Sequence, residues 1–93
     1  IHLVMEIVKN RYGVDRVYEK LDSTRIRVMG ESLLSRGSQD EEGNQIMFDF
    51  EGGPCFNVGG KILYIGMEYE ITSLKSEPIK EENVASVVVG IKA

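Results

Sequence analysis

The residues in this chain best suited to nucleophilic chemistry are its only cysteine, Cys55, and its only histidine, His2. A thiol nucleophile needs a base beside it or a lowered pKa, and His2 stands at the far N-terminal end of the sequence. Backbone amides in the glycine-rich segment around Cys55 could stabilise a thiolate. A lone cysteine more commonly serves as a small, half-buried apolar side chain. We therefore rank a cysteine-dependent enzyme last among three functions and expect no catalytic residues.

Metal and phosphate motifs are incomplete. Residues 38–49 match part of a calcium-binding loop, but they begin with Ser38 and end with Asp49, whereas such loops begin with Asp and end with Glu. The chain has no second cysteine or histidine to complete a zinc site. Residues 59–62 read Gly-Gly-Lys-Ile, without the Ser or Thr that a phosphate-binding loop requires. We expect neither a metal nor a cofactor.

A glycine-rich segment at residues 52–62 is the most unusual stretch of the sequence. It contains four of the ten glycines, one of the two prolines and the only cysteine. Glycine permits positive φ and close approach of the backbone, so the segment predicts a sharp corner between two strands. Exposed amides there could also hold an anion. The residues predicted to bind such an anion are Arg25, Arg27, Arg36, Gly52, Gly53, Cys55, Asn57 and Lys61.

Four carboxylates lie on the outward faces of two expected strands. Asp49 and Glu51 alternate on one strand, and Glu68 and Glu70 alternate on a later one. Like charges directly opposite one another are unfavourable. Either these strands are apart, or the arginines of residues 24–28 run between them. Acid–base catalysis by a carboxylate pair would need a cleft, which the pattern does not imply.

Composition and charge describe one globular domain over residues 1–93. Hydrophobic residues make up 42% and charged residues 28%, which suits a single core. Residues 1–30 carry six basic and four acidic groups, while residues 31–93 carry five basic and eleven acidic groups. An acidic chain repels phosphate, so nucleic-acid binding is disfavoured. The asymmetry suits a solvated surface or association between a basic and an acidic face.

The sequence lacks the usual signals for membranes or secretion. The longest apolar run, residues 84–91, is about one strand long, so no membrane span is expected. The start has no basic region and no small-residue cleavage site. One cysteine is compatible with a reducing compartment. We predict a cytoplasmic location and no membrane partner.

Helical spacing of apolar residues over residues 2–12 predicts a short N-terminal helix, with Gly13 as its C-terminal cap. The β-branched residues at 7 and 8 leave a strand open there. Residues 14–21 also fit one helical face, although we favour a strand because a turn at 21–24 follows.

The remaining patterns predict strands and turns. The expected strands cover residues 16–21, 24–28, 45–51, 61–64, 67–75 and 84–91. The third strand alternates strictly, with Ile46, Phe48 and Phe50 expected inward, and the last is apolar on both faces. Residues 35–44 read as an exposed loop or hairpin tip, and Ile65-Gly66 as a tight turn. The fold expected is α+β and mainly β: a small antiparallel barrel or roll of five to seven short strands with one N-terminal helix.

Residues 58–71 read Val-Gly-Gly-Lys-Ile-Leu-Tyr-Ile-Gly-Met-Glu-Tyr-Glu-Ile. This rhythm of glycine, strand, glycine and Tyr-x-Ile resembles the late hairpins of small phage virion-joining β-barrels. The resemblance is confined to that stretch and implies a viral or accessory assembly module. No functional residues are transferred from it.

Three functions follow, in order of preference. The first is a non-enzymatic protein-binding or assembly module, self-associating through a sheet edge or the N-terminal helix, because the last strand needs cover on both faces. The second is a binding protein for a small anionic metabolite or nucleotide, held between the glycine corner and loop 31–44. The third is the cysteine-dependent enzyme.

Overall fold

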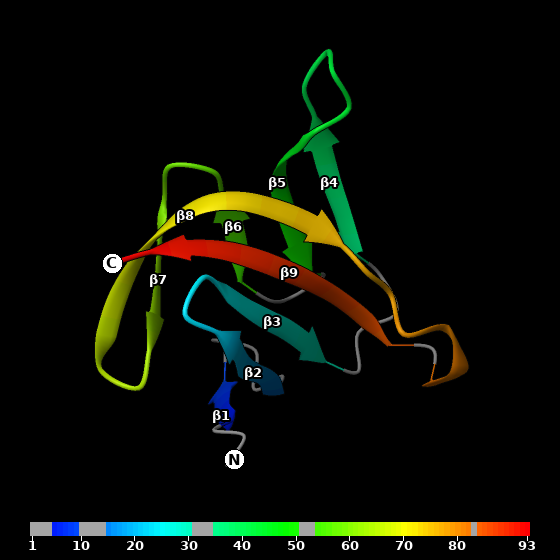
Figure 1. Cartoon of the computed structure of the whole chain (residues 1–93). Coiled ribbons are helices and arrows are strands. Elements are labelled where there is room, and N and C mark those ends of the chain that lie inside the picture. Colours follow the sequence, from blue (N-terminus) through cyan, green and yellow to red (C-terminus); the bar gives the residue numbers. More distant parts are fainter. Residues whose placement is uncertain (1–4, 10–14, 31–34, 51–53, 83) are drawn as a thin grey trace.

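A computed structural model describes residues 5–9, 15–30, 35–50, 54–82 and 84–93, with side chains from Arg16 onward (Figure 1). The elements are β1 (Met5–Lys9), β2 (Asp15–Asp22), β3 (Arg25–Gly30), β4 (Ser35–Gln39), β5 (Gln45–Phe50), β6 (Cys55–Asn57), β7 (Lys61–Tyr64), β8 (Met67–Ser76), the short 3-10 helix η1 (Lys80–Glu82) and β9 (Ala85–Lys92). Within these residues the strands form one nine-stranded sheet in the order β1-β2-β3-β9-β8-β5-β4, with β6 beside β5 and β7 beside β8. All of its pairings are antiparallel, which confirms the mainly β prediction.

The predicted N-terminal helix is wrong. Residues 5–9 form strand β1, which pairs with β2 in a register that sets Ile7 opposite Val17. An isolated helix this short is marginal, whereas a strand beside β2 gains a full ladder of hydrogen bonds. The β-branched residues at 7 and 8 favour that outcome. The rest of the expected helix and Gly13 lie outside the described residues.

The sheet does not close into the predicted barrel. Its path ends at β1 on one side and at β4 on the other, and these two strands are not paired with each other. Strand β5 pairs with β8 only between Gln45 and Leu74, so the β4–β5 hairpin is free to stand away from the sheet. Figure 1 shows this hairpin as an arm above the curved β8 and β9. The result is a strongly curved, open sheet.

Residues 35–44, predicted as an exposed loop or hairpin tip, include a strand. Ser35–Gln39 is β4, exposed throughout, and the tip follows at residues 40–44. Asp40 orders that tip, because its carboxylate accepts hydrogen bonds from the Glu42 and Asn44 amides at 3.0 and 2.8 Å. Ile46 was expected inward but is exposed, since it lies where the hairpin leaves the core.

The predicted hairpin at residues 16–29 is confirmed as β2 and β3. Asp22 closes its turn: one carboxylate oxygen accepts bonds from the Thr24 amide and hydroxyl at 2.8 and 2.9 Å. The other oxygen pairs with Arg25 at 2.8 Å. Side chains of Asp22, Thr24 and Arg25 therefore hold the turn that was predicted at residues 21–24.

The predicted burial of the last strand on both faces is confirmed, and the chain itself supplies the cover. Residues 85–91 of β9 are buried between β3 and β8. On the outer face, Val88 lies between Arg27 and Lys75 in the strand registers. Glu77 contacts both of these cations at 3.5 Å. Val88 is only 7% exposed in the single chain, so β9 needs no second protein to bury it.

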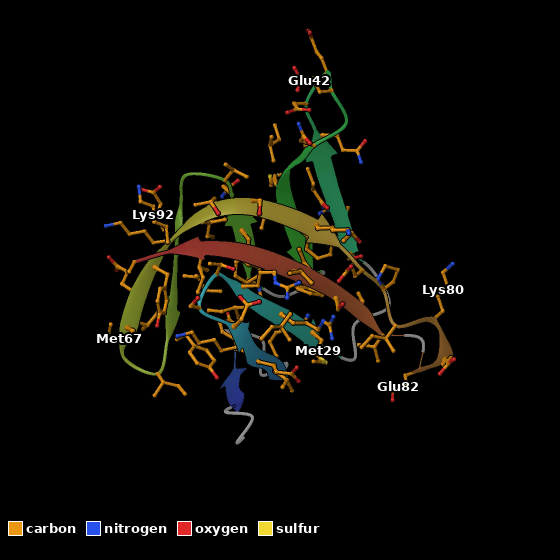
Figure 2. The ribbon with its side chains drawn as sticks, in the orientation of Figure 1. Met29, Glu42, Met67, Lys80, Glu82 and Lys92 are labelled. Carbon is orange, nitrogen blue, oxygen red and sulfur yellow. The ribbon has the colours of Figure 1, made fainter. Side chains whose placement is uncertain are left out.

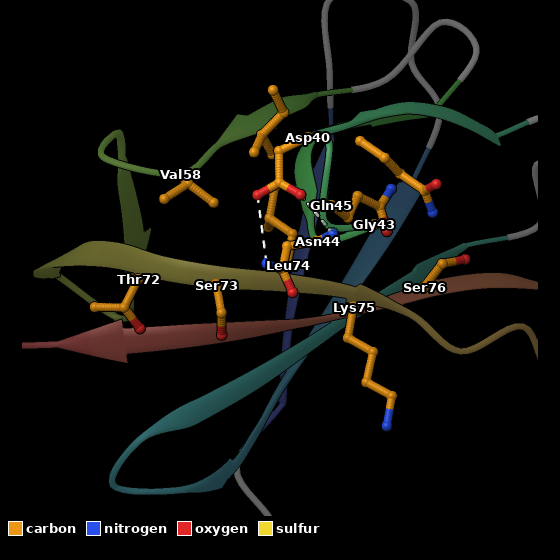
Figure 3. Close-up of a pocket in the computed structure, with 12 residues that line it drawn as sticks. Asp40, Gly43, Asn44, Gln45, Val58, Thr72, Ser73, Leu74, Lys75 and Ser76 are labelled. Atoms are coloured by element: carbon orange, nitrogen blue, oxygen red, sulfur yellow. Dashed lines mark hydrogen bonds between the residues drawn. The ribbon is translucent and has the colours of Figure 1, made fainter.

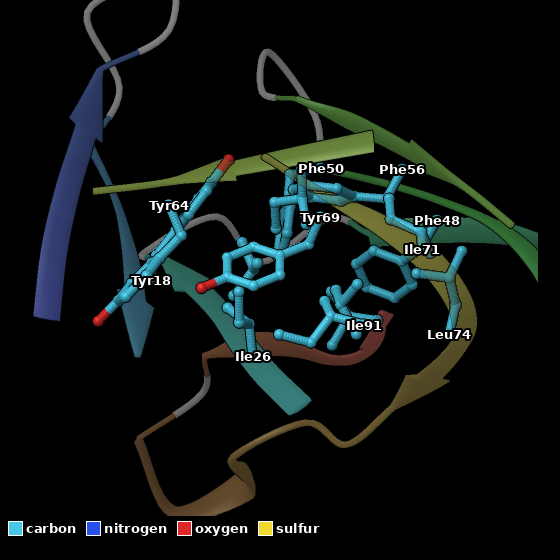
Figure 4. Close-up of a cluster of buried hydrophobic side chains, with 14 of the residues drawn as sticks. Tyr18, Ile26, Phe48, Phe50, Phe56, Tyr64, Tyr69, Ile71, Leu74 and Ile91 are labelled. Carbon is cyan, nitrogen blue, oxygen red and sulfur yellow. The ribbon is translucent and has the colours of Figure 1, made fainter. Parts of the chain in front are cut away.

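The core lies inside the curve of the sheet (Figure 4). Its buried side chains are Tyr18, Ile26, Val28, Phe48, Phe50, Phe56, Ile62, Tyr64, Tyr69, Ile71, Leu74, Ala85, Val87, Val89 and Ile91. Tyr18 meets Phe56 edge-on, with ring centroids 6.2 Å apart, which joins β2 to β6 across the curve. Arg16 is fully buried and its guanidinium lies 4.8 Å from the centroid of the Phe50 ring.

Candidate functional site

Each arginine predicted to bind an anion contacts a carboxylate. The pairs are Arg25 with Asp22 at 2.8 Å, Arg27 with Glu77 at 3.5 Å and Arg36 with Asp49 at 3.5 Å. Strands β3 and β4, which carry these arginines, are separated along the sheet by β9, β8 and β5. The structure therefore separates Arg36 from Arg25 and Arg27, which share β3. Gly52 and Gly53 lie outside the described residues.

For the outward carboxylates, the structure matches neither alternative as expected, because the acidic strands β5 and β8 are neighbours in the sheet but pair at one position alone. Asp49 pairs with Arg36, and its strand meets β8 at the single position Gln45–Leu74, away from Glu68. The arginine strand β3 runs between β2 and β9 rather than between the acidic strands. Hence no acidic face forms among these residues, and Glu51 lies outside the described range.

The other predicted residues meet at a hollow beside β7. Cys55 and Lys61 line an opening of about 300 Å³, which we call the β7 hollow. Its remaining walls are Tyr18, Pro54, Phe56, Ile62 and Leu63. Asn57 is adjacent, with its Nδ2 3.9 Å from the Cys55 sulfur. Three of the eight predicted binding residues thus lie together, in a setting that is largely apolar.

The glycine-rich segment contains a short strand and a turn instead of one corner. Cys55–Asn57 forms β6, and the Gly60 amide then donates to the Asn57 carbonyl at 2.9 Å. Gly59, third in this turn, has a φ of 89°, which glycine adopts without strain. Lys61 follows this turn as the first residue of β7, where it lines the hollow.

The turn that joins β7 to β8 presents large apolar side chains to solvent. Leu63, Ile65 and Met67, the β7–β8 tip, are 60%, 50% and 57% exposed. In Figure 2 Met67 lies at the outer margin of the molecule, far from Glu42 on the β4–β5 hairpin. The register pairs Leu63 with Glu68 and Met67 with Tyr64, so Leu63 and Met67 lie on opposite faces of the hairpin, with Ile65 in the turn between them. Exposed large apolar residues at three alternate positions of one hairpin differ from the scattered single residues that are normal on a protein surface.

Ile65 also has a strained backbone. Its φ is +45°, and that of Gly66 is +75°, as in the type I′ turn that connects tight hairpins. Asn or Asp commonly precedes the glycine in such turns, because a β-branched residue rarely adopts positive φ. The Ile65-Gly66 pair predicted the turn, and the isoleucine in it is also the sequence signal of this mismatch. Ile65 is therefore a candidate for a binding role, although it was not among the residues predicted to bind an anion.

A larger groove, of about 680 Å³, lies between the β4–β5 hairpin and β8 (Figure 3). Residues 72–76 of β8 form one wall, and residues 39–40 and 43–46 form the other. Asp40 there bonds to Asn44 within its own turn, and Lys75 pairs with Glu77 at 3.5 Å. Its charged groups are thus engaged locally, so the groove has no converging charge for a small ionic ligand.

The shifted pKa values have structural causes. The hydrogen bond from Arg25, reinforced by Thr24, lowers the pKa of Asp22 from 3.8 to about 2, and the same pair raises the pKa of Arg25. Burial lowers the pKa of Arg16. Within the described part of the chain, no three His, Cys, Asp or Glu side chains gather in a way that could hold a metal ion.

No known protein family, curated protein or solved structure matches this chain. Among the described residues, no helix has the length and apolar composition needed to cross a membrane.

Proposed function

We propose that this protein is a non-enzymatic binding or assembly module that contacts another protein through the β7–β8 tip. The observation that carries the proposal is Ile65, a half-exposed β-branched residue held at positive φ between exposed Leu63 and Met67. A left-handed conformation of this kind costs about 1–3 kcal/mol, and such costs are retained mainly where a function uses them. Burying apolar side chains of the tip against a partner would add a favourable free energy of similar size, about 1.5–3 kcal/mol for each fully buried side chain.

The substitution Ile65→Asn separates this function from a purely structural turn. Asparagine tolerates positive φ, so we expect the variant to be more stable by about 1 kcal/mol in urea unfolding. The same variant removes the central apolar contact, so its association should weaken. Binding would be compared between the wild type and the variant by sedimentation and by affinity capture, with Val58→Asn as a control at an exposed turn residue away from the tip. A wild type that stays strictly monomeric and captures the same proteins as Ile65→Asn would contradict the proposal.

A small anionic ligand is the second candidate, and the β7 hollow supports it because Lys61 lies at its rim. Lys61 already pairs with Glu68 at 3.1 Å, so an anion would have to compete with that carboxylate. A thermal-shift series with phosphate and nucleotides, repeated on Lys61→Gln, tests this candidate. We expect no shift that depends on Lys61; such a shift would favour the ligand over the protein contact. Cysteine-dependent catalysis, which we ranked last of the three functions, is not tested, because His2 lies outside the described residues.

A further inference from the structure

Strand β4 ends the sheet on the side of the β4–β5 hairpin, and its outer edge is not paired with any strand that the structure describes. All of its residues are exposed. We propose that this edge binds an extended, basic segment of another protein, which adds to the sheet as one more strand. The surface is separate from the β7–β8 tip, so this inference goes beyond the proposed function. In Figure 2 Glu42, at the end of the hairpin, lies far from Met67 of the tip.

The composition of β4 leaves its edge open for pairing. An unpaired edge presents a row of backbone amide and carbonyl groups, and many proteins protect it with proline, lysine or a covering segment. Ser35–Gln39 contains neither proline nor lysine, and Gly37 has no side chain that an incoming strand would have to displace. A register shift between Ser38 and Gln39 interrupts the ladder near the tip, so pairing should centre on residues 35–38. Main-chain hydrogen bonds there provide most of the affinity, as is general for β-strand addition.

Charge beside this edge selects a basic partner. Asp40, Glu41 and Glu42 follow β4 directly and are exposed. Among the residues that the structure describes, no lysine or arginine pairs with these three carboxylates, and the hydrogen bonds that Asp40 accepts come from neutral amides. The one cation of the hairpin, Arg36, already lies 3.5 Å from Asp49. An acidic segment would be repelled here, whereas a basic segment gains an attraction that also guides its approach.

The direction of the added strand follows from the sheet. All of the described strand pairings are antiparallel, and antiparallel pairing is slightly more stable per residue than parallel pairing. Strand β4 runs toward the acidic tip at residues 40–42, so an antiparallel partner begins beside that tip. The basic residues of the partner should therefore precede its strand-forming residues in sequence.

Two synthetic peptides of identical composition test this order. The first is acetyl-Lys-Arg-Lys-Thr-Val-Thr-Val-Thr-amide, and the second carries the same residues in reverse. Threonine and valine are used because they favour extended structure. Each peptide is titrated into the full chain, and amide NMR shifts and hydrogen exchange are recorded. We expect saturable binding of the first peptide with new protection at alternate amides of residues 35–38, and weaker binding of the second.

Variants of the chain test the charge. Glu41→Gln combined with Glu42→Gln should weaken binding of the first peptide by about threefold to tenfold, since exposed ion pairs are individually weak. The matched control is Glu81→Gln combined with Glu82→Gln, which removes two adjacent, exposed glutamates from η1 and should leave binding unchanged. Ile65→Asn should also leave it unchanged, so failure of this inference is distinguishable from failure of the proposed function.

Absence of binding, equal binding of the two peptides, equal loss in the Glu81 and Glu82 control, or protection that appears outside β4 would each overturn the proposal. A concentration-dependent dimer of the chain alone, with protected amides in β4, would also overturn it, because the edge would then pair with a second copy.

Discussion

At the scale of single residues, the most informative side chains are those whose environment conflicts with their type. Ile65 adopts a backbone conformation that asparagine or glycine would adopt at lower cost. Arg16 is a cation buried over the Phe50 ring, where burial lowers its pKa. Asp22, in contrast, suits its place, because it accepts bonds from both Thr24 and Arg25. The first conflict is the basis of the proposed binding role, and the second places a contact between β2 and β5.

Asp22 should make stability depend on pH in the acid range. Its pKa is lowered from 3.8 to about 2 in the folded chain, so the folded state favours the charged form. The stabilisation is complete above the unfolded value of 3.8 and is lost as pH falls through about 2. We expect Asp22→Asn to be less stable than the wild type near neutral pH, with a difference that shrinks toward pH 2. Urea unfolding of both proteins at several pH values tests this, and a difference that grows on acidification would contradict it.

At the scale of elements, each strand depends on what its neighbours allow. The sequence pattern predicted the β2–β3 hairpin, the turn at Ile65-Gly66 and the strand β9, because alternation and turn residues are local signals. It missed β4, since Ser35–Gln39 has no apolar face and becomes a strand only by pairing with β5. It also predicted a helix where pairing with β2 produces β1. Whether a polar edge segment or a short amphipathic segment forms a strand depends on the strand beside which it lies.

Gly37 is required for the β4–β5 hairpin. A Cβ atom at this position would collide with the Met47 carbonyl oxygen and the Gln45 side-chain amide. The carbonyl belongs to the paired strand and cannot move without disturbing the ladder. We expect Gly37→Ala to cost about 1–3 kcal/mol and to loosen amide protection in β4 and β5 first. Ser38→Ala, at an exposed neighbouring position, should be close to neutral. Equal effects of the two substitutions in urea unfolding and hydrogen exchange would contradict this role for Gly37.

At the scale of the whole molecule, the fold is completed by contacts between distant parts of the sequence. Strand β9 lies between β3 and β8, so the C-terminal strand joins the early hairpin to the later ones. Its residues 85–91 are buried within the same chain on both faces. The apolar last strand therefore no longer argues for a partner. The exposed apolar side chains that support the proposed association lie instead at the β7–β8 tip.

This topology should make refolding slow for a chain of this size. The β3–β9 pairing must be made across most of the sequence before the core is complete, and sheets dominated by such contacts fold in milliseconds to seconds. We expect stopped-flow refolding from urea to fall in that range. Relaxation in microseconds would indicate that local hairpins, rather than the β3–β9 pairing, limit the reaction.

Local sequence patterns were enough to predict the β class, the hairpin turns and most of the core strands, and they contain no complete catalytic or metal motif. These features depend on alternation, turn chemistry and residue type, which are local. The tertiary structure decided that the sheet stays open, that each predicted arginine contacts a carboxylate, and that Cys55 and Lys61 share a hollow with Leu63. It also decided that Ile65 is strained and exposed. Pairing partners, register and burial arise between segments far apart in the chain, so no local pattern could determine them.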